Sequence, residues 1–575
     1  MPSHRFAPAP AVRRALPRSL ALAGAVAATA AAVLLPSTVA SADTGATTTV
    51  VGRLMQTWAE SEHSGTAAAA EAEGPQSFVV TADGTTVPVA TQGVAGVPLD
   101  ATVSVTVGGT AEQASGNPGG NAAAAPALPV LDSTLVKSPP PPAVLPARRF
   151  TNQVTVVTVV PAGSTPDGTT AAQVADLVDH EVADFWSEQT GGAVRIGVTK
   201  TIDGVRTTAG CSKAATLWNE VAATVKFTAG PGKHLLIYLP RTLTSCAYAL
   251  AEVGRSTTSG GRLYVRDTTA SVIAHELGHN FGLGHSSGRQ CDTAVDSGTC
   301  RTAPYRDFYD VMGVSWGELG TLNALQASRL KVLPPSAQQS LSVDGAAGTV
   351  TLSPLSGRTG TRGLRLTDST GAEYYLEYRA ATGQDAWLAA SDNRYGLDSG
   401  VLVHRAGSFP DTSLLLDGTP GASAGWDADL SSALPVGTPV SLAGGQFTVV
   451  LQEISEQGAV LKVVPTPPAA APAPAPAPSV DGTGQVLAGG SAEAAPDVPA
   501  AAAEVPAAAP AAPAAPAAAP AALPEDATPH ATPALRAAAD TSSRSGFVLY
   551  AAGVLCGATL LLVVRRARRS ATRLR

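Results

Sequence analysis

The segment from His275 to His285 constrains this chain more than any other. It places histidines at 275, 279 and 285, a glutamate at 276 and a glycine at 282. Residues four apart on a helix lie on nearly the same face, so His275 and His279 can direct two imidazole nitrogens at one ion. Gly282 can adopt a left-handed conformation, which ends the helix and turns the chain back with His285 as a third ligand.

These residue types point to a catalytic metal site. Three neutral histidines leave the fourth position of a tetrahedral Zn²⁺ ion open for water, as in catalytic rather than structural sites. Glu276 projects to the side, within reach of a bound water, and is predicted to be the general base. A lone histidine is more often structural than ligating, but the match at five positions favours a site for one zinc ion.

A second motif adds to what the histidine segment indicates. The pattern H-E-x-x-H-x-x-G-x-x-H resembles the signature of the metzincin zinc metallopeptidases. That clan also has a methionine turn beneath the metal, and Met312 fits it within Tyr309-Asp310-Val311-Met312-Gly313. Together the two motifs are most similar to the gametolysin-like family, over roughly residues 150–465. The resemblance implies a zinc metalloendopeptidase with a protein or peptide substrate.

The chain departs from the clan in two respects. Some metzincins have a tyrosine ligand two residues after the methionine, where this chain has Val314. Tyr305 or Tyr309 remains a candidate for stabilising the transition state. Residues 43–148 contain no cysteine, so latency through a cysteine thiolate on the zinc is not expected.

Both ends of the chain resemble targeting segments. Arginines precede an apolar stretch from Leu20 to Leu35 and a small-residue site, which predicts a signal peptide over residues 1–42; an N-terminal anchor is the alternative. The apolar residues 546–564 are long enough to span a bilayer, and the basic residues 565–575 follow. The positive-inside rule therefore predicts one transmembrane helix with a cytoplasmic tail and an extracellular body.

A cell-wall attachment is the alternative to this membrane anchor. Residues 523–527, Leu-Pro-Glu-Asp-Ala, resemble a sortase signal but lack the Thr-Gly that cleavage requires. A retained anchor at the extracellular face is therefore favoured, with release by processing as the alternative. The net charge of −7 argues against a nucleic-acid partner.

The cysteines agree with an exported body. Cys556 lies in the predicted membrane helix, and the remaining cysteines are Cys211, Cys246, Cys291 and Cys300. An even number in an oxidising compartment indicates two disulfides. The pairs Cys211–Cys246 and Cys291–Cys300 are preferred, although other connectivities remain open. The sequence contains no C-x-x-C pair, so a zinc site made of cysteines is not expected.

The chain outside the motif divides by composition. Residues 43–112 contain short β-type runs, over Thr47 to Leu54, Ser77 to Thr81 and Ala101 to Val107, and predict a small β-rich module, either a prodomain or an accessory domain. Residues 113–147 are rich in Gly, Ala and Pro and predict a linker. Residues 336–465 return to short β-type runs and predict an all-β, sandwich-like domain. Residues 466–545 are rich in Pro and Ala and predict a disordered stalk.

Residues 148–335 are predicted to form an α/β (α+β) catalytic domain with a mixed twisted sheet and a metal-binding helix. Strands are expected over residues 153–160, 194–198, 234–239, 247–253 and 262–266, and helices over 170–189, 214–225 and from Thr268 or Thr269 onward.

The predicted activity is the hydrolysis of peptide bonds by a metal-activated water. The substrate is expected to lie extended along the edge strand near Ala247 to Val253. A catalytically silent surface adhesin on the same fold is the alternative function, and zinc content together with casein cleavage would separate the two.

Overall fold

The structure is a computed structural model. It describes residues 47–60, 75–109, 127–145, 149–314, 318–391, 393, 395–421 and 429–468, all within one compact unit, Met1–Ala473. The predicted signal peptide, transmembrane helix and basic tail lie outside the described residues, as does the predicted stalk beyond residue 468. No helix in the described part of the chain is long and apolar enough to cross a membrane.

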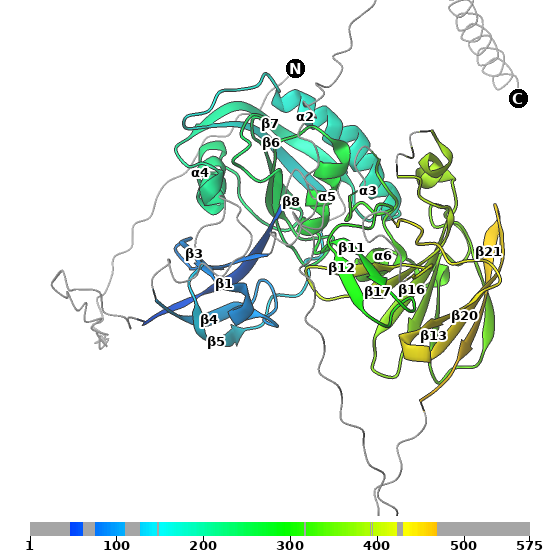
Figure 1. Cartoon of the computed structure of the whole chain (residues 1–575). Coiled ribbons are helices and arrows are strands. Elements are labelled where there is room, and N and C mark those ends of the chain that lie inside the picture. The colour runs from blue at the N-terminus through cyan, green and yellow to red at the C-terminus, as the bar shows by residue number, and fades with distance from the viewer. Residues whose placement is uncertain are drawn as a thin grey trace, which may run out of the picture. The chain divides into compact units, whose positions relative to one another are not determined.

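The fold is mixed α+β and rich in strands, as predicted (Figure 1). The first sheet has the strand order β3-β2-β1-β9-β10-β8-β6-β7, with β4 and β5 joined to it through β1. Its catalytic half contains β6 (Asn152–Pro161), β7 (Ile196–Thr207), β8 (Lys233–Tyr238), β9 (Ala249–Glu252) and β10 (Gly261–Val265). β6, β7, β8 and β10 pair in parallel, whereas β9 runs antiparallel to β10.

Helices cover both faces of this half, which explains why its central strands are nearly continuous apolar runs. Val154 and Leu236 pack on one face with α2 (Ala171–Leu177), the π-helical segment η3 (Val178–Val182), α3 (Ala183–Gln189) and α5 (Ala270–Asn280). Val157 and Leu235 face the opposite side, against α4 (Ala214–Val225). A capping box of Thr170 and Gln173 starts α2.

The N-terminal strands form a small β-rich module. They are β1 (Thr47–Glu60), β2 (Gln76–Val80), β3 (Thr86–Val89), β4 (Thr102–Gly108) and β5 (Val130–Lys137). The structure differs from the sequence prediction in two ways. β5 lies within the predicted linker and pairs with β4. β1 continues six residues beyond Leu54, and its last four residues pair antiparallel with β9 of the catalytic half.

The C-terminal part is a sandwich of two sheets. The four-stranded sheet contains β14 (Gly348–Leu352), β19 (Pro439–Leu442), β20 (Phe447–Ser455) and β21 (Gly458–Pro465). The seven-stranded sheet has the order β12-β11-β18-β17-β16-β15-β13. Leu352 of β14, Leu376 of β16 and Val449 of β20 share one buried cluster, so the two sheets pack face to face.

Two strands of the seven-stranded sheet come from within the predicted catalytic domain. They are β11 (Ser286–Cys291), which begins directly after His285, and β12 (Cys300–Ala303). β11 pairs in parallel with β18, far along the chain. A boundary at residue 335 therefore does not separate two independent sheets. The other strands are β13 (Gln338–Ser342), β15 (Gly363–Thr367), β16 (Glu373–Arg379), β17 (Gly400–Ala406) and β18 (Ser413–Leu416).

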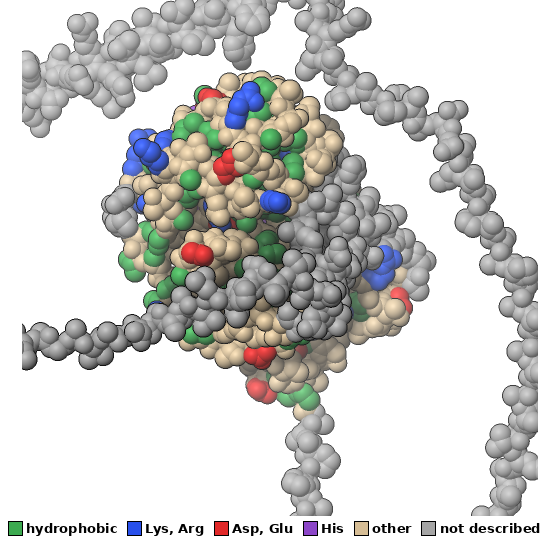
Figure 2. All heavy atoms as spheres, turned by 90° about the vertical axis from the view of Figure 1, so that its left-hand side faces the viewer, with side chains coloured by type: hydrophobic (Ala, Val, Ile, Leu, Met, Phe, Trp, Pro, Cys, Tyr) green, Lys and Arg blue, Asp and Glu red, His purple; other side chains and the backbone are tan. Residues whose placement is uncertain are grey.

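Short helices complete the described elements. They are α6 (Ala324–Arg329) and the 3₁₀ turns η1 (Thr91–Val94), η4 (Cys211–Lys213), η5 (Pro335–Ala337), η6 (Gly383–Ala389) and η7 (Ala443–Gly445). Disulfides join Cys211 to Cys246 and Cys291 to Cys300, the pairs preferred from the sequence. On the face drawn in Figure 2, described acidic and basic side chains are scattered singly rather than gathered in one patch.

Candidate metal centre

Helix α5 positions the first two histidines. His275 and His279 lie one turn apart on it, and both are buried. The helix ends at Phe281, and Gly282 follows with φ of +95°. A Cβ on Gly282 would lie 2.9 Å from the Arg255 Cα, so both the dihedral angle and the space require glycine. The turn then delivers His285, whose backbone N–H donates to the carbonyl of Pro410 at 2.7 Å.

The three imidazoles converge on one point. The Nε2 atoms of His275 and His279 are 3.1 Å apart, and His285 brings a third ligand atom into the same group. Tetrahedral zinc with Zn–N bonds of about 2.05 Å separates its ligand atoms by about 3.3 Å. The donor set and its spacing therefore fit a zinc ion, and the cluster is a possible metal site.

Backbone carbonyls orient two of these rings. The Nδ1 atom of His275 lies 2.8 Å from the Val311 carbonyl, and that of His279 lies 2.9 Å from the Leu283 carbonyl. Donation from Nδ1 leaves the Nε2 lone pair free for a metal, as in other histidine sites. Burial lowers the pKa of His285 to about 3, which keeps that ring neutral and able to bind an ion.

Glu276 lies on the same helix and is completely buried. Neither of its carboxylate oxygens has a hydrogen-bond partner within the described chain. Burial raises the pKa of Glu276 well above its ordinary value, and the nearby carboxylate of Glu60 adds to this effect. A buried carboxylate without a protein partner beside a metal site is suited to hold and transfer a proton.

The structure adds a residue that the sequence analysis did not find. Glu60, the last residue of β1, places Oε1 at 3.1 Å from His279 Nε2, 3.2 Å from His285 Nε2 and 3.4 Å from His275 Nε2. Burial alone would raise the pKa of Glu60, but its close contacts with His285, His275 and His279 outweigh burial and lower the pKa well below the ordinary value. Glu60 therefore stands as a fourth potential ligand.

Little in the sequence could have revealed this contact. Thr57 and Trp58 favour strands, so β1 could have been extended beyond Leu54. However, Glu60 and His279 are 219 residues apart, and no local pattern links them.

Met312 packs directly beneath the helix. A Cβ on Gly278 would lie 2.3 Å from the Met312 Sδ and 3.4 Å from Trp186, so the glycine allows close approach. The neighbouring Val311 carbonyl is the partner of His275 Nδ1. The methionine turn thus both supports α5 and orients a ligand.

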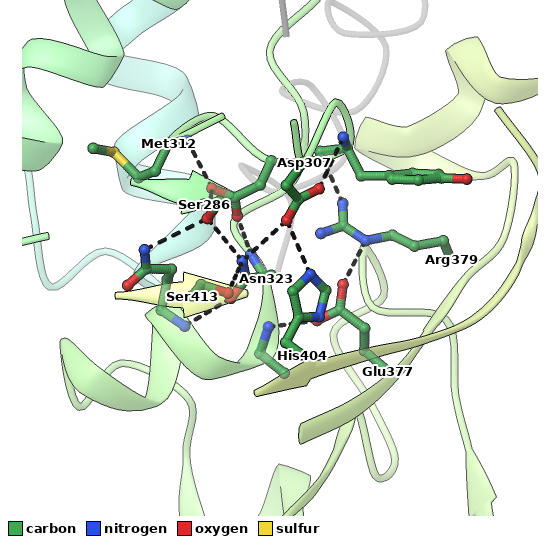
Figure 3. Close-up of polar contacts among 12 residues, drawn as sticks. Ser286, Asp307, Met312, Asn323, Glu377, Arg379, His404 and Ser413 are labelled. Carbon is green, nitrogen blue, oxygen red and sulfur yellow. Dashed lines mark hydrogen bonds and ion pairs between the residues drawn. The ribbon is translucent and has the colours of Figure 1, made fainter. Parts of the chain in front are cut away.

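A buried polar network joins this turn to the C-terminal sandwich (Figure 3). His404 of β17 lies 2.9 Å from the Asp307 carboxylate through its Nε2 atom. Arg379 of β16 donates to Glu377 at 2.7 Å and to the Tyr309 carbonyl at 3.1 Å. The side chains of Asp307, Glu377, Arg379 and His404 are all fully buried. The sandwich therefore helps to position the methionine turn.

The two candidate tyrosines have different surroundings. The ring of Tyr305 lies 3.9 Å from that of His285, centroid to centroid, so Tyr305 belongs to the site. The Tyr309 hydroxyl instead donates to the Asp398 carbonyl at 2.9 Å, away from the histidines. Val314 packs in an apolar cluster with Tyr305 and Phe308.

Asn280 connects the helix to the edge strand. Its Nδ2 atom donates to the Glu252 carbonyl of β9 at 2.8 Å, and its Oδ1 atom lies 2.9 Å from His234 Nδ1. His234 is buried, and its Nε2 atom lies 2.9 Å from Asn152. The spacing between the metal site and β9 is therefore fixed by a buried side chain of the motif itself.

Comparison with known proteins bears on this site. Residues 242–286, which include the edge strand and all three histidines, match the model of the metallo-peptidase family M12B, reprolysin-like. This match supports a metallopeptidase. A search of curated proteins gives no match to the chain.

Among solved structures, the chain is similar to crystal structures of OgpA from Akkermansia muciniphila. One wild-type structure has 13% identity and a TM-score of 0.23, covering 41% of this chain and 73% of that chain. Catalytically inactive OgpA in complex with an O-glycopeptide substrate has 13% identity and a TM-score of 0.21, covering 41% of this chain and 72% of that chain. At these TM-scores the likeness carries no argument about function.

Proposed function

We propose that this chain is a zinc-dependent endopeptidase of the metzincin clan, closest to the gametolysin-like family, that hydrolyses peptide bonds in proteins. The observation that carries the proposal is the convergence of three histidine nitrogens beside a buried, unpartnered Glu276. His275, His279 and His285 would hold the ion. Zinc, when bound, would lower the pKa of a water molecule and polarise the scissile carbonyl.

The chain's own groups would supply the remaining steps. Glu276 would accept a proton from the attacking water and return it to the leaving amine. The carbonyls of Val311 and Leu283 would hold the imidazole rings in place throughout. Met312 and Gly278 would keep α5 at a fixed height above the methionine turn.

The substrate would add as an extended strand at β9. Support comes from β1, which pairs with β9 through residues 57–60 and thereby shows that this edge accepts a strand beside the histidines. The two disulfides support an oxidising, extracellular compartment, and we propose the outer face of the cell membrane as the location. Surface labelling of intact cells would test that location.

The decisive experiment compares the full chain with its Glu276→Gln variant. Zinc per chain is measured by mass spectrometry, and casein cleavage is followed before and after limited trypsin treatment, with the trypsin then inhibited. We expect equal zinc and an activity loss of about 10²-fold or more in the variant. Glu456→Gln, in an exposed turn between β20 and β21, serves as the matched control.

Two results would contradict the proposal. Undiminished casein cleavage by Glu276→Gln would exclude Glu276 as the base. A wild-type chain that binds zinc but cleaves neither casein nor a peptide library, even after trypsin treatment, would favour the silent adhesin.

A further inference from the structure

We propose that residues 47–60 hold this peptidase latent, with strand β1 occupying the substrate edge and the Glu60 carboxylate taking the fourth ligand position at the metal. The inference rests on the proposed function, because it assigns a regulator to the same site. Three features of the described residues support it. β1 pairs with the edge strand β9, the side chains of Glu60 and Trp58 lie at the histidines, and the N-terminal module has a hydrophobic core of its own.

The backbone pairing closes the edge. Thr57 to Glu60 pair antiparallel with Ala249 to Glu252, and β10 occupies the other side of β9. The pairing extends at both ends, because Tyr248 N–H donates to the Glu60 carbonyl at 2.6 Å and Val253 N–H donates to the Gln56 carbonyl at 2.9 Å. An extended peptide therefore cannot pair with β9 while β1 remains there.

Glu60 is placed as a ligand rather than as a neighbour. Its Oε1 atom lies 3.1 to 3.4 Å from each of the three histidine Nε2 atoms. These distances are similar to the separation between two ligand atoms of a tetrahedral zinc ion, so Glu60 would hold a bound ion as its fourth protein ligand. A catalytic zinc site needs the fourth position for water, whereas four protein ligands are typical of a structural site. Hydrolysis consequently requires Glu60 to leave.

Trp58 adds a side-chain anchor. Residues two apart on a strand point to the same face, so Trp58 faces the metal site as Glu60 does. Its indole N–H donates to the Tyr305 hydroxyl at 2.7 Å, and its ring lies 4.5 Å from that of His285 in an edge-on contact. Only 2% of the Trp58 surface is exposed. β1 thus covers Tyr305 and His285 as well as the ligand position.

The N-terminal module can leave without dismantling the catalytic core. Its own buried cluster is built around Leu54, Val79 and Val103 and is distinct from the clusters beneath the catalytic sheet. Of the β1 residues, Ala59 is the one that joins a catalytic cluster. Displacement of β1 therefore breaks mainly edge hydrogen bonds and the contacts of Trp58 and Glu60.

The test uses the full chain and a small zinc-binding probe, acetohydroxamate. Calorimetry measures its Kd for wild type, Glu60→Gln and the control Asp132→Asn, which changes an exposed carboxylate of the same module. A site that is only fractionally open weakens the apparent affinity by that fraction. We expect Glu60→Gln to bind at least about tenfold more tightly than wild type at unchanged zinc content, and Asp132→Asn to match wild type.

A second measurement does not depend on the Glu60 substitution. Saturating acetohydroxamate should accelerate hydrogen exchange of the amides in residues 57–60 and 249–252 of the wild-type chain, because the probe and Glu60 compete for one position. Trp58→Ala, which loosens β1 without altering the ligand, should also strengthen probe binding.

The results for Glu60→Gln decide whether Glu60 blocks the site. Equal acetohydroxamate affinity in wild type and Glu60→Gln would overturn the proposal, and so would loss of zinc from Glu60→Gln, since Glu60 would then build the site. Tight probe binding by Glu60→Gln without any peptide cleavage would uphold the block by Glu60 but reject the endopeptidase function. Failure of the inference and failure of the proposed function are therefore distinguishable.

Discussion

The carboxylate of Asp310 accepts a hydrogen bond from the backbone N–H of Met312 at 2.7 Å. The same oxygen accepts the Ser286 hydroxyl at 3.0 Å, and the other oxygen accepts the Asn323 N–H at 2.5 Å. Burial, together with the charge of Asp307, raises the pKa of Asp310 to about 7. One side chain thus fixes the methionine turn, the strand that follows His285 and the start of α6.

Asp310→Asn should destabilise the fold although it preserves the side-chain size. An amide nitrogen would replace one acceptor oxygen, and a buried backbone N–H would lose its partner. We expect a loss of about 1–3 kcal/mol in the free energy of unfolding at pH 8, measured by urea denaturation. Asp344→Asn, at an exposed position, should leave the transition unchanged. Equal stability of both variants would show that Asp310 does not organise the turn.

Gly278→Ala should push Met312 out of place. The new Cβ would lie 2.3 Å from the Met312 Sδ and 3.1 Å from its Cε, and Trp186 closes the space beside it. Overpacking of this kind costs about 1–3 kcal/mol. Met312→Ala removes the clashing atoms, so the double variant should lose less stability than the two single losses added together. If the stability losses of the two single variants simply add up in thermal unfolding, the close contact between position 278 and Met312 is contradicted.

Gly282→Ala should weaken metal binding more than it weakens the rest of the fold. The φ of +95° disfavours any side chain, and the added Cβ would meet the Arg255 backbone. The turn would shift and carry His285 away from the other ligands. We expect zinc affinity, measured by chelator competition, to fall at least about tenfold, the equivalent of about 1.4 kcal/mol. Gly348→Ala, where a Cβ meets open space, is the control.

The His404–Asp307 pair should make stability depend on pH. Burial lowers the pKa of His404, but the carboxylates of Glu377 and Asp307 outweigh it and leave the pKa raised, despite the opposing charge of Arg379. A raised folded pKa means that the contribution is fully present below the unfolded value of about 6.5 and is lost as pH rises through the folded value.

The free energy of unfolding of wild type should therefore fall as pH increases above about 6.5, and His404→Gln should flatten this part of the curve. Urea titrations across the range provide the measurement. His180→Gln should retain the wild-type slope, because His180 is exposed and solvent screens its charge. If the free energy of unfolding changes equally with pH in wild type and His404→Gln, the pH dependence does not come from His404.

The helices and central strands of the catalytic half were accessible from the sequence because their signals are local. The apolar face of residues 170–189 and the apolar run of residues 153–160 correspond to α2, η3 and α3, and to β6. The ends of β1 and the place of β5 were not predicted. Both depend on which sheet edge a segment meets, and residue spacing does not encode that choice.

The sequence by itself determined the three-histidine set and Glu276, since helical spacing and one glycine bring these side chains together within eleven residues. Only the tertiary structure decided which distant residues lie against these side chains. The pairing of β1 with β9 carries Glu60 to His279 across 219 residues, and β18 receives the strand that follows His285. Local periodicity fixes which face a residue occupies, whereas strand pairing between distant segments arises only when the whole chain packs.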